Sequence, residues 1–204
     1  MENKIYEKVE KVGTYGWIVV TKSIITDWLY DGTTIENESL KYNIELEDGS
    51  LVCNEWFDTY DFESNGRCII GYKRNSTELE ALSKYYGYPN NETVVIEQFC
   101  FRYGAINTKG NFVVPAIYDR LSFDNEDAYI AYHNGKLGYV DSELGTQITP
   151  IVFNHAESFD NGQAYVEYEG KNSKKKGYIN RKNVFRFNLS SWLKEDSKAK
   201  KLVK

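Results

Sequence analysis

The sequence predicts an all-β protein made of tandem β-hairpin repeats, folded as a single elongated or curved domain with one short helical insertion. Two observations carry this prediction. The 204 residues include 17 tyrosines and 10 phenylalanines but only 3 prolines, and aromatic side chains pack well on the pleated surface of a sheet. In addition, short segments with the same spacing of glycine, aromatic and proline residues recur along the chain, which is typical of repeat proteins.

Each repeat is expected to begin with a glycine that opens a short strand. In three of four such segments an aromatic residue follows the glycine, and its side chain is expected to pack between neighbouring hairpins. The glycines are Gly16, Gly104, Gly138 and Gly177, and the aromatic residues are Trp17, Tyr139 and Tyr178.

The second half of the repeat has a proline and, a few residues later, an aromatic residue followed by Asp or Asn. Because the aspartate recurs once per repeat, we interpret it as a structural residue that bonds local backbone amides in an Asx-turn. The residues of this half are Pro115 with Asp119, Pro150 with Asn154, and, with asparagine in place of proline, Asn54 with Asp58.

A β-hairpin is predicted over residues 128–140, because Asn134-Gly135 separates two apolar runs. Alternation along the first strand places Tyr129 on the face opposite Ala128, Ile130 and Tyr132. In the corresponding strand of the next repeat, Tyr165 and Glu167 lie on the face that is expected to meet solvent. Repeated tyrosines on such a face suit a protein-binding surface, so the partner-binding candidates are Tyr129, Tyr165 and Glu167.

The repeats are expected to form one domain, enlarged near its start by two insertions. The predicted organisation is a domain over 1–188, with unit 1 at about 13–72 and its insertion at 23–48, a helical insertion at 73–102, unit 2 at about 103–136, unit 3 at about 137–175 and a partial unit 4 at about 176–188, followed by a lysine-rich tail at 189–204.

A short helix is predicted near residues 77–86. Thr77 and Glu80 have the spacing of a capping box, and Gly87 suits the position just after a helix. Stacked repeats need covered ends, and we expect this helix and the segment Phe185–Leu193 to provide the cover.

Charge is distributed unevenly along the chain. Residues 1–170 hold 13 Lys and Arg against 28 Asp and Glu, whereas residues 171–204 hold 12 against 2. The lysine-rich stretch at 171–182 invites a nucleic-acid interpretation, but the acidic body to which it is attached would repel phosphate. We therefore expect no nucleic-acid partner.

The composition predicts a cytoplasmic protein. The chain opens without an apolar signal region, and no stretch approaches the roughly 18 consecutive apolar residues of a membrane helix. Cys53, Cys68 and Cys100 are odd in number and lack CxxC spacing, so neither a disulfide framework nor a zinc site is predicted.

No catalytic, metal or cofactor site is predicted. Nucleophile-elbow, phosphate-loop and zinc-protease motifs are absent from the sequence. Of the two histidines, His133 falls in the predicted Asn-Gly turn and His155 has no catalytic context. Asp58 with Asp61, or Asp124 with Glu126 and Asp127, could be an acid–base pair or a site for a hard cation. The repeat already explains the aspartate, however, and the second segment lacks calcium-loop spacing.

The recurring pattern resembles the WG repeat of bacterial proteins, in which glycine, an aromatic residue, Ile and Asp or Asn precede apolar residues, proline and Tyr-Asp or Phe-Asp. The resemblance is close over residues 103–183 and weaker over 12–72. Ala105 stands where the family prefers an aromatic residue, and Glu126-Asp127 replaces a glycine. The resemblance implies stacked hairpin-containing units that serve as an interaction scaffold and carry no catalytic motif.

These observations together predict a non-catalytic protein-binding module or scaffold, whose acidic face and outward tyrosines engage a protein partner. An acidic inhibitor or immunity-type protein that blocks a basic site is an alternative. An enzyme that uses carboxylates of the insertions, such as Asp27, Asp31 or Glu36, is another. A carbohydrate-binding protein, which would need several exposed and coplanar rings, is the last.

Overall fold

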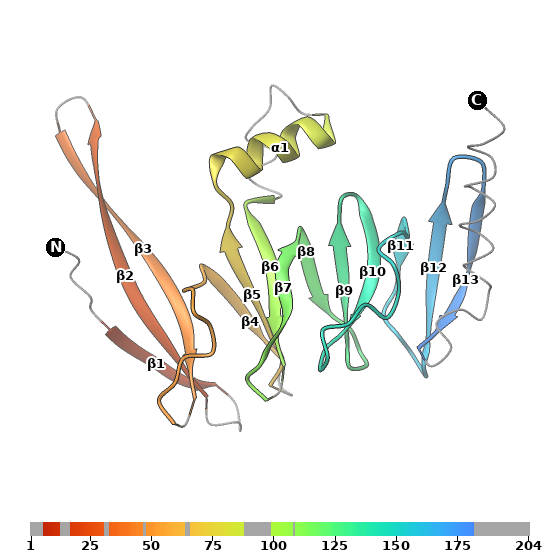
Figure 1. Cartoon of the computed structure of the whole chain (residues 1–204), viewed down its shortest axis with the longest axis horizontal. Coiled ribbons are helices and arrows are strands. Elements are labelled where there is room, and N and C mark those ends of the chain that lie inside the picture. Colours follow the sequence, from red (N-terminus) through yellow and green to blue (C-terminus); the bar gives the residue numbers. More distant parts are fainter. Residues whose placement is uncertain are drawn as a thin grey trace. The chain divides into compact units, whose positions relative to one another are not determined.

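The computed structural model describes residues 6–12, 17–30, 33–46, 48–63, 66–87, 99–107 and 109–181, and it gives the backbone alone for residues 6–12, 17–18, 23–30 and 33–38. The described chain is mostly β-strand with one helix, so the predicted all-β class is confirmed (Figure 1). The chain divides into two compact units, Met1–Ala116 and Ile117–Lys204. The single domain over 1–188 stays a prediction.

The first unit contains two antiparallel sheets and the helix. One sheet has the order β1-β2-β3 and the other the order β4-β5-β6-β7, the last strand of which runs on to Tyr118. The strands are β1 (Tyr6–Val12), β2 (Trp17–Tyr30), β3 (Thr33–Glu45), β4 (Thr59–Phe62), β5 (Cys68–Lys73), β6 (Phe101–Ile106) and β7 (Phe112–Tyr118), and the helix is α1 (Ser76–Tyr86).

The second unit contains two three-stranded antiparallel sheets with the orders β10-β9-β8 and β11-β12-β13. In each sheet a short strand leads into a hairpin. The strands are β8 (Arg120–Phe123), β9 (Ala128–His133), β10 (Lys136–Asp141), β11 (His155–Ala156), β12 (Gln163–Glu169) and β13 (Lys174–Asn180).

One hydrogen-bonding pattern, which we call the clasp, marks three successive repeats. The side chain of an Asp or Asn at the end of the proline-containing segment accepts a bond from a backbone N–H 15 residues further along, at the tip of the next hairpin. This bond reaches much further than the Asx-turn that the sequence predicts. The three clasps are Asp58 with Lys73 N, Asp119 with Asn134 N, and Asn154 with Glu169 N, each at 2.8 Å.

The clasp residues and the ladder pairing together make the members of two hydrophobic cores equivalent. Each core begins on one hairpin, passes through the segment that ends at the clasp and is completed by the next hairpin. The core of the first unit holds Ile44, Phe57, Cys68, Ile70 and Ile106, and that of the second unit holds Tyr139, Phe153, Ala164, Val166 and Ile179 at the equivalent positions. The two cores are thus built from equivalent positions of the repeats.

The hairpin predicted over 128–140 is confirmed as β9 and β10. Its turn residues Asn134 and Gly135 have φ values of 50° and 74°, the left-handed conformations that a tight turn between twisted strands requires. The hairpin β12–β13 turns instead through residues 170–173.

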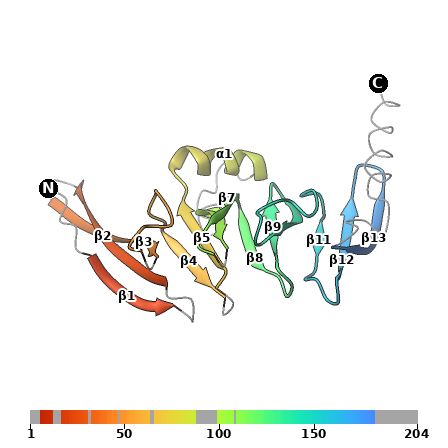
Figure 2. The ribbon, with the colours of Figure 1, turned by 60° about the horizontal axis from the view of Figure 1, so that its bottom comes forward.

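Both predicted insertions lie at hairpin tips. The segment 23–48 contributes to the long hairpin β2–β3, and 73–102 places α1 between β5 and β6. Arg74 extends the β5–β6 ladder, since its N–H donates to Cys100 O at 2.8 Å. Figure 2 shows α1 across the end of β5.

The strand pairing changes the predicted start of unit 1. Gly104 and Gly138 lie on the second strand of a hairpin, opposite Ile70 and Ala131. In the first hairpin the equivalent residue is Asn43 of β3, opposite Val20. The glycine that the sequence assigns to this role, Gly16, lies outside the described residues, and Trp17 begins the first strand of that hairpin rather than the second.

The helix begins two residues earlier than the predicted capping box implies. Asn75 is the N-cap, with extended backbone at φ −79° and ψ 171°. Its side chain accepts from Glu78 N while the Glu78 carboxylate accepts from Asn75 N. The predicted box of Thr77 and Glu80 is therefore wrong, because Thr77 is already helical. Gly87 ends the helix in the left-handed conformation at φ 76°, as predicted.

The predicted cap Phe185–Leu193 and the tail 189–204 lie outside the described residues, as does part of unit 4. Among the residues that the structure describes, no helix is long and apolar enough to cross a membrane.

Candidate functional site

Two of the three predicted partner-binding residues lie together on the last described hairpin. Tyr165 is opposite Tyr178, and Glu167 is opposite Lys176 on the neighbouring strand and His155 on the other side. We call these five residues the outer face, because the alternate residues of β12, Ala164, Val166 and Tyr168, are buried in the core.

The centre of the outer face is a pair of tyrosine rings. The Tyr165 and Tyr178 ring centroids are 5.6 Å apart and the ring planes meet at 67°. His155 approaches Tyr165 from the other side, with centroids 6.1 Å apart. Tyr178 is 50% exposed, so an aromatic surface of appreciable size meets solvent here.

Charged groups of both signs border this ring pair. Glu167 Oε1 accepts hydrogen bonds from Lys176 Nζ at 2.6 Å and from the Tyr165 hydroxyl at 3.0 Å. The bond from Lys176 holds the pKa of Glu167 below its usual value, and the same bond raises the pKa of Lys176. Both groups are therefore charged at neutral pH. A second pair, Lys174 with Glu169 at 2.6 Å, lies closer to the hairpin tip.

Tyr129, the third predicted binding residue, is completely buried, so the expected row of exposed tyrosines is wrong at this position. The ladder shows why. Tyr129 is opposite Phe123, as Cys68 is opposite Phe62, and the clasp alignment makes Tyr129 equivalent to Cys68 and Ala164, both of them buried. The segment between the clasp residue and the next phenylalanine is one residue longer before Phe159 than before Phe123. Because of this extra residue, the sequence pattern matches Tyr129 with Tyr165 and not with Ala164.

The aromatic residues after the repeat glycines have different environments. Tyr139 is fully buried, packs against Phe159 with ring centroids 4.7 Å apart and planes tilted by 54°, and donates its hydroxyl hydrogen bond to Glu157 O. Tyr178 occupies the same repeat position but is half exposed. Trp17 is described by its backbone alone.

The glycines before these positions have a geometric role. A Cβ on Gly104 would lie 2.5 Å from Val114 O, and a Cβ on Gly138 would lie 2.6 Å from Pro150 O. The proline-containing segments thus pack directly against the glycine backbones. Pro115 itself is exposed and Pro150 is half buried.

The candidate catalytic carboxylates are engaged in repeat packing. Asp58 and Asp119 form clasps, and Asp119 Oδ2 lies 3.6 Å from His133 Nδ1. Asp124 accepts from Phe159 N, and Glu126 accepts from Gly162 N, each at 2.7 Å. These bonds link one repeat to the next and give Asp124 and Glu126 a structural role.

Within the described ranges, no three His, Cys, Asp or Glu side chains gather closely enough to hold a metal ion. Cys53, Cys68 and Cys100 are free thiols. Burial raises the pKa of Cys53 to about 11, so it is a thiol rather than a nucleophilic thiolate at neutral pH. Asp31 and the side chains of Asp27 and Glu36 lie outside the described residues.

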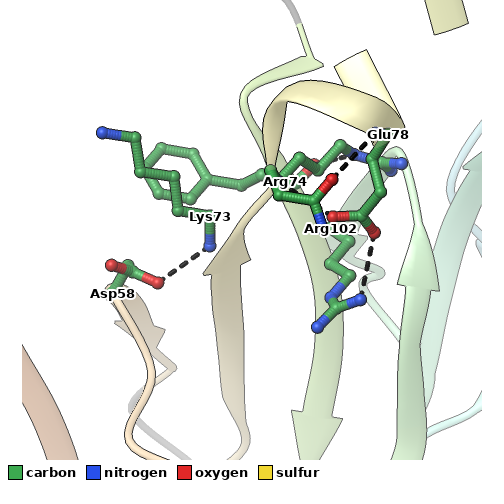
Figure 3. A network of polar contacts seen from close by, with 7 residues as sticks. Asp58, Lys73, Arg74, Glu78 and Arg102 are labelled. Atoms are coloured by element: carbon green, nitrogen blue, oxygen red, sulfur yellow. Dashed lines mark hydrogen bonds and ion pairs between the residues drawn. The ribbon is translucent and has the colours of Figure 1, made fainter. Parts of the chain in front are cut away.

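The first unit also has an open cleft of about 440 Å³, which the sequence did not indicate. Arg102 lies 5.9 Å over the Tyr72 ring and donates to Glu78 of the helix cap at 3.0 Å. Figure 3 shows this ion pair beside the Asp58 clasp and Arg74. The cleft is lined by Val52, Cys53, Asn54, Glu55, Tyr72, Arg102, Phe112 and Ala116.

Recurrent clasps and two cores built from equivalent positions define a β-hairpin repeat protein. The family model of the WG containing repeat matches residues 103–136 and 138–171. The chain therefore carries two adjacent WG repeats, and the resemblance seen in the sequence is confirmed for this part of it. No curated protein and no solved structure matches the chain.

Proposed function

We propose that this protein is a non-catalytic protein-binding module and that the outer face of hairpin β12–β13 binds its partner. The supporting observation is the different burial of two equivalent tyrosines. Tyr139 is 0% exposed whereas Tyr178 is 50% exposed. The repeat thus places at the surface, on its last described hairpin, an aromatic residue that it elsewhere uses in a core.

The composition of the outer face supports a protein ligand. Protein interfaces combine a central group of aromatic residues with a charged, solvent-accessible rim. Here Tyr165 and Tyr178 form the centre, and the Glu167–Lys176 pair lies at the rim. A flat sugar platform is not supported, because the two rings meet at 67° rather than lying in one plane.

The acidic-inhibitor alternative differs in its electrostatics. Residues 1–170 carry 28 acidic against 13 basic side chains, a charge that would steer a basic partner. The outer face carries both signs, so a partner bound there should associate with only modest salt dependence. A fall in association rate of about 100-fold or more between low and physiological salt would favour the inhibitor.

Site-specific photocrosslinking in native cell lysate tests the proposal. A photoreactive phenylalanine analogue replaces Tyr178 in one variant and Leu144 in the control, because Leu144 belongs to the same unit and is 72% exposed. We expect one discrete intermolecular product from position 178 that excess wild-type protein suppresses, and none from position 144. Equal products from both positions, or none from position 178, would refute the outer face as the binding site.

A further inference from the structure

The outer face is the first half of a repeat core. The two cores described above begin on Ile44 of β3 and on Tyr139 of β10. The equivalent residue of the last hairpin is Tyr178, because Gly177 pairs with Val166 as Gly138 pairs with Ala131. Tyr178 is therefore the residue at which a third core of this kind would begin.

The following hairpin completes each of the two earlier cores. In the first unit it contributes Cys68 and Ile70, and in the second it contributes Ala164 and Val166. Small or branched side chains recur at these positions, next to the larger residue of the preceding hairpin. In the second unit the completing segment also supplies Glu157 O, the acceptor for the Tyr139 hydroxyl.

We propose that the outer face binds a β-hairpin of a partner protein, and that this hairpin completes the third core as the next repeat completes the first two. The inference rests on the proposed function and specifies the partner's chemistry. The bound hairpin presents small or branched aliphatic residues at alternate positions to Tyr165 and Tyr178.

The rim of the outer face is charged, as expected of a surface that meets water when no partner is bound. Clasp alignment makes Glu167 equivalent to Tyr132, and the ladder pairs Lys176 with Glu167 as it pairs Leu137 with Tyr132. A charged pair therefore takes the place of two partly buried apolar residues. An ion pair at the rim keeps the empty face soluble and leaves the aromatic centre available.

A second copy of the chain is a poor occupant. The hairpin faces that could complete the third core are buried in their own molecule, at Ile70 in the first unit and at Val166 in the second. Val20, at the equivalent position of hairpin β2–β3, is only 5% exposed. Among the described residues, a second copy therefore has no available face of this kind.

A synthetic hairpin tests the inference on the full-length protein. The probe is a backbone-cyclised peptide copying residues 163–180, whose aliphatic face carries Ala164 and Val166, and the control probe has lysine at those two positions. We expect the first probe to shift the NMR signals of the Tyr165 and Tyr178 rings and the second to leave them unchanged. Equal binding of both probes, or binding of neither, overturns the hairpin inference.

Variants of the protein sharpen this test. Tyr178→Lys should weaken binding of the first probe at least about tenfold, whereas Tyr178→Phe, which keeps the ring, and Leu144→Lys, which changes a remote exposed site, should retain it. Near-wild-type affinity of Tyr178→Lys would overturn the inference.

The crosslinking result separates this inference from the proposed function. If Tyr178 crosslinks to a cellular protein but the cyclised probe does not bind, the hairpin inference fails and the protein-binding module stands. If position 178 crosslinks only within its own chain or to a second copy, both fail.

Discussion

At the scale of single residues, the clasp predicts which side chains can replace its aspartate. Asp119 is fully buried and accepts from Asn134 N, and Asn154 makes the same bond with an amide oxygen. Asp119→Ala removes the charged acceptor of the Asn134 N–H and should lower the free energy of unfolding by about 2 kcal/mol. Asp119→Asn should lower it by less than about 1 kcal/mol, because the natural repeat already uses asparagine there. Urea unfolding measures both, and equal losses would contradict the clasp.

A second residue predicts how stability changes with pH. Burial raises the pKa of Asp124 above its ordinary value of 3.8, so the folded state binds the proton more tightly than the unfolded state does. The stability that the protonated carboxyl contributes is present below pH 3.8 and is lost as pH rises through the raised pKa.

Asp124→Asn removes this pH dependence while its amide oxygen can still accept from Phe159 N. We expect the unfolding free energy of the variant, relative to that of the wild type, to be highest at pH 7 and to decrease as the pH falls toward 3.8. Denaturant unfolding at a series of pH values measures it. A difference that stays constant across the series would show that burial does not govern this carboxyl.

The sequence placed Tyr165 and Glu167 on one strand face, as the structure shows, but it expected Tyr129 at the surface, where the structure has it buried. Partner binding by Tyr165 and Glu167 stays a prediction. Alternation by two residues determines which side chains share a strand face, and this was enough to place Tyr165 beside Glu167. It does not determine which residues of two diverged repeats are equivalent. That depends on ladder register, and one extra residue before Phe159 moved Tyr129 from the predicted surface to the core position of Ala164.

At the scale of elements, the helix α1 offers a direct comparison of two capping assignments. Asn75→Ala removes the observed cap and should destabilise the helix by about 1 kcal/mol. Thr77→Ala, which removes the residue favoured by sequence spacing, should have little effect, because Thr77 is an exposed residue of the first turn. Hydrogen exchange of the amides in 79–84 reports the local stability. Faster exchange in the Thr77 variant than in the Asn75 variant would contradict the observed cap.

The hairpin turns show why some elements were predictable and others were not. Asn134-Gly135 determines a two-residue turn by its own backbone preferences, so the hairpin β9–β10 could be read directly from the sequence. The long hairpin β2–β3 carries no such signal at its insertion. The residues around Trp17 therefore resembled the start of a repeat without occupying that position in the hairpin. Asn43 occupies the position of the repeat glycine, but an asparagine does not match the sequence pattern there.

At the scale of the whole molecule, the repeat explains how one chain tolerates two large insertions. The strands before and after a hairpin tip are held by their own ladder and by the clasp, so the tip can carry additional structure without changing either core. The pair Tyr72 and Arg102 flanks the helical insertion as His133 and Lys136 flank Asn134-Gly135. The helix is thus an elaboration of the tip rather than part of the repeat.

This view predicts that the insertion can be exchanged for the simpler turn. Replacing residues 73–101 by Asn-Gly should join Tyr72 to Arg102 through a tight turn, whose asparagine N–H would take the place of Lys73 N in the Asp58 clasp. We expect the variant to lose its helical circular dichroism and still unfold cooperatively, although the apolar contacts of Leu82 and Phe99 are lost. The matched control uses Pro-Pro, which has neither the N–H for the clasp nor the positive φ of the turn, and it should not form the β5–β6 ladder. If the Asn-Gly variant behaves like the Pro-Pro control, the helix is required for the repeat to fold and is not an insertion at its tip.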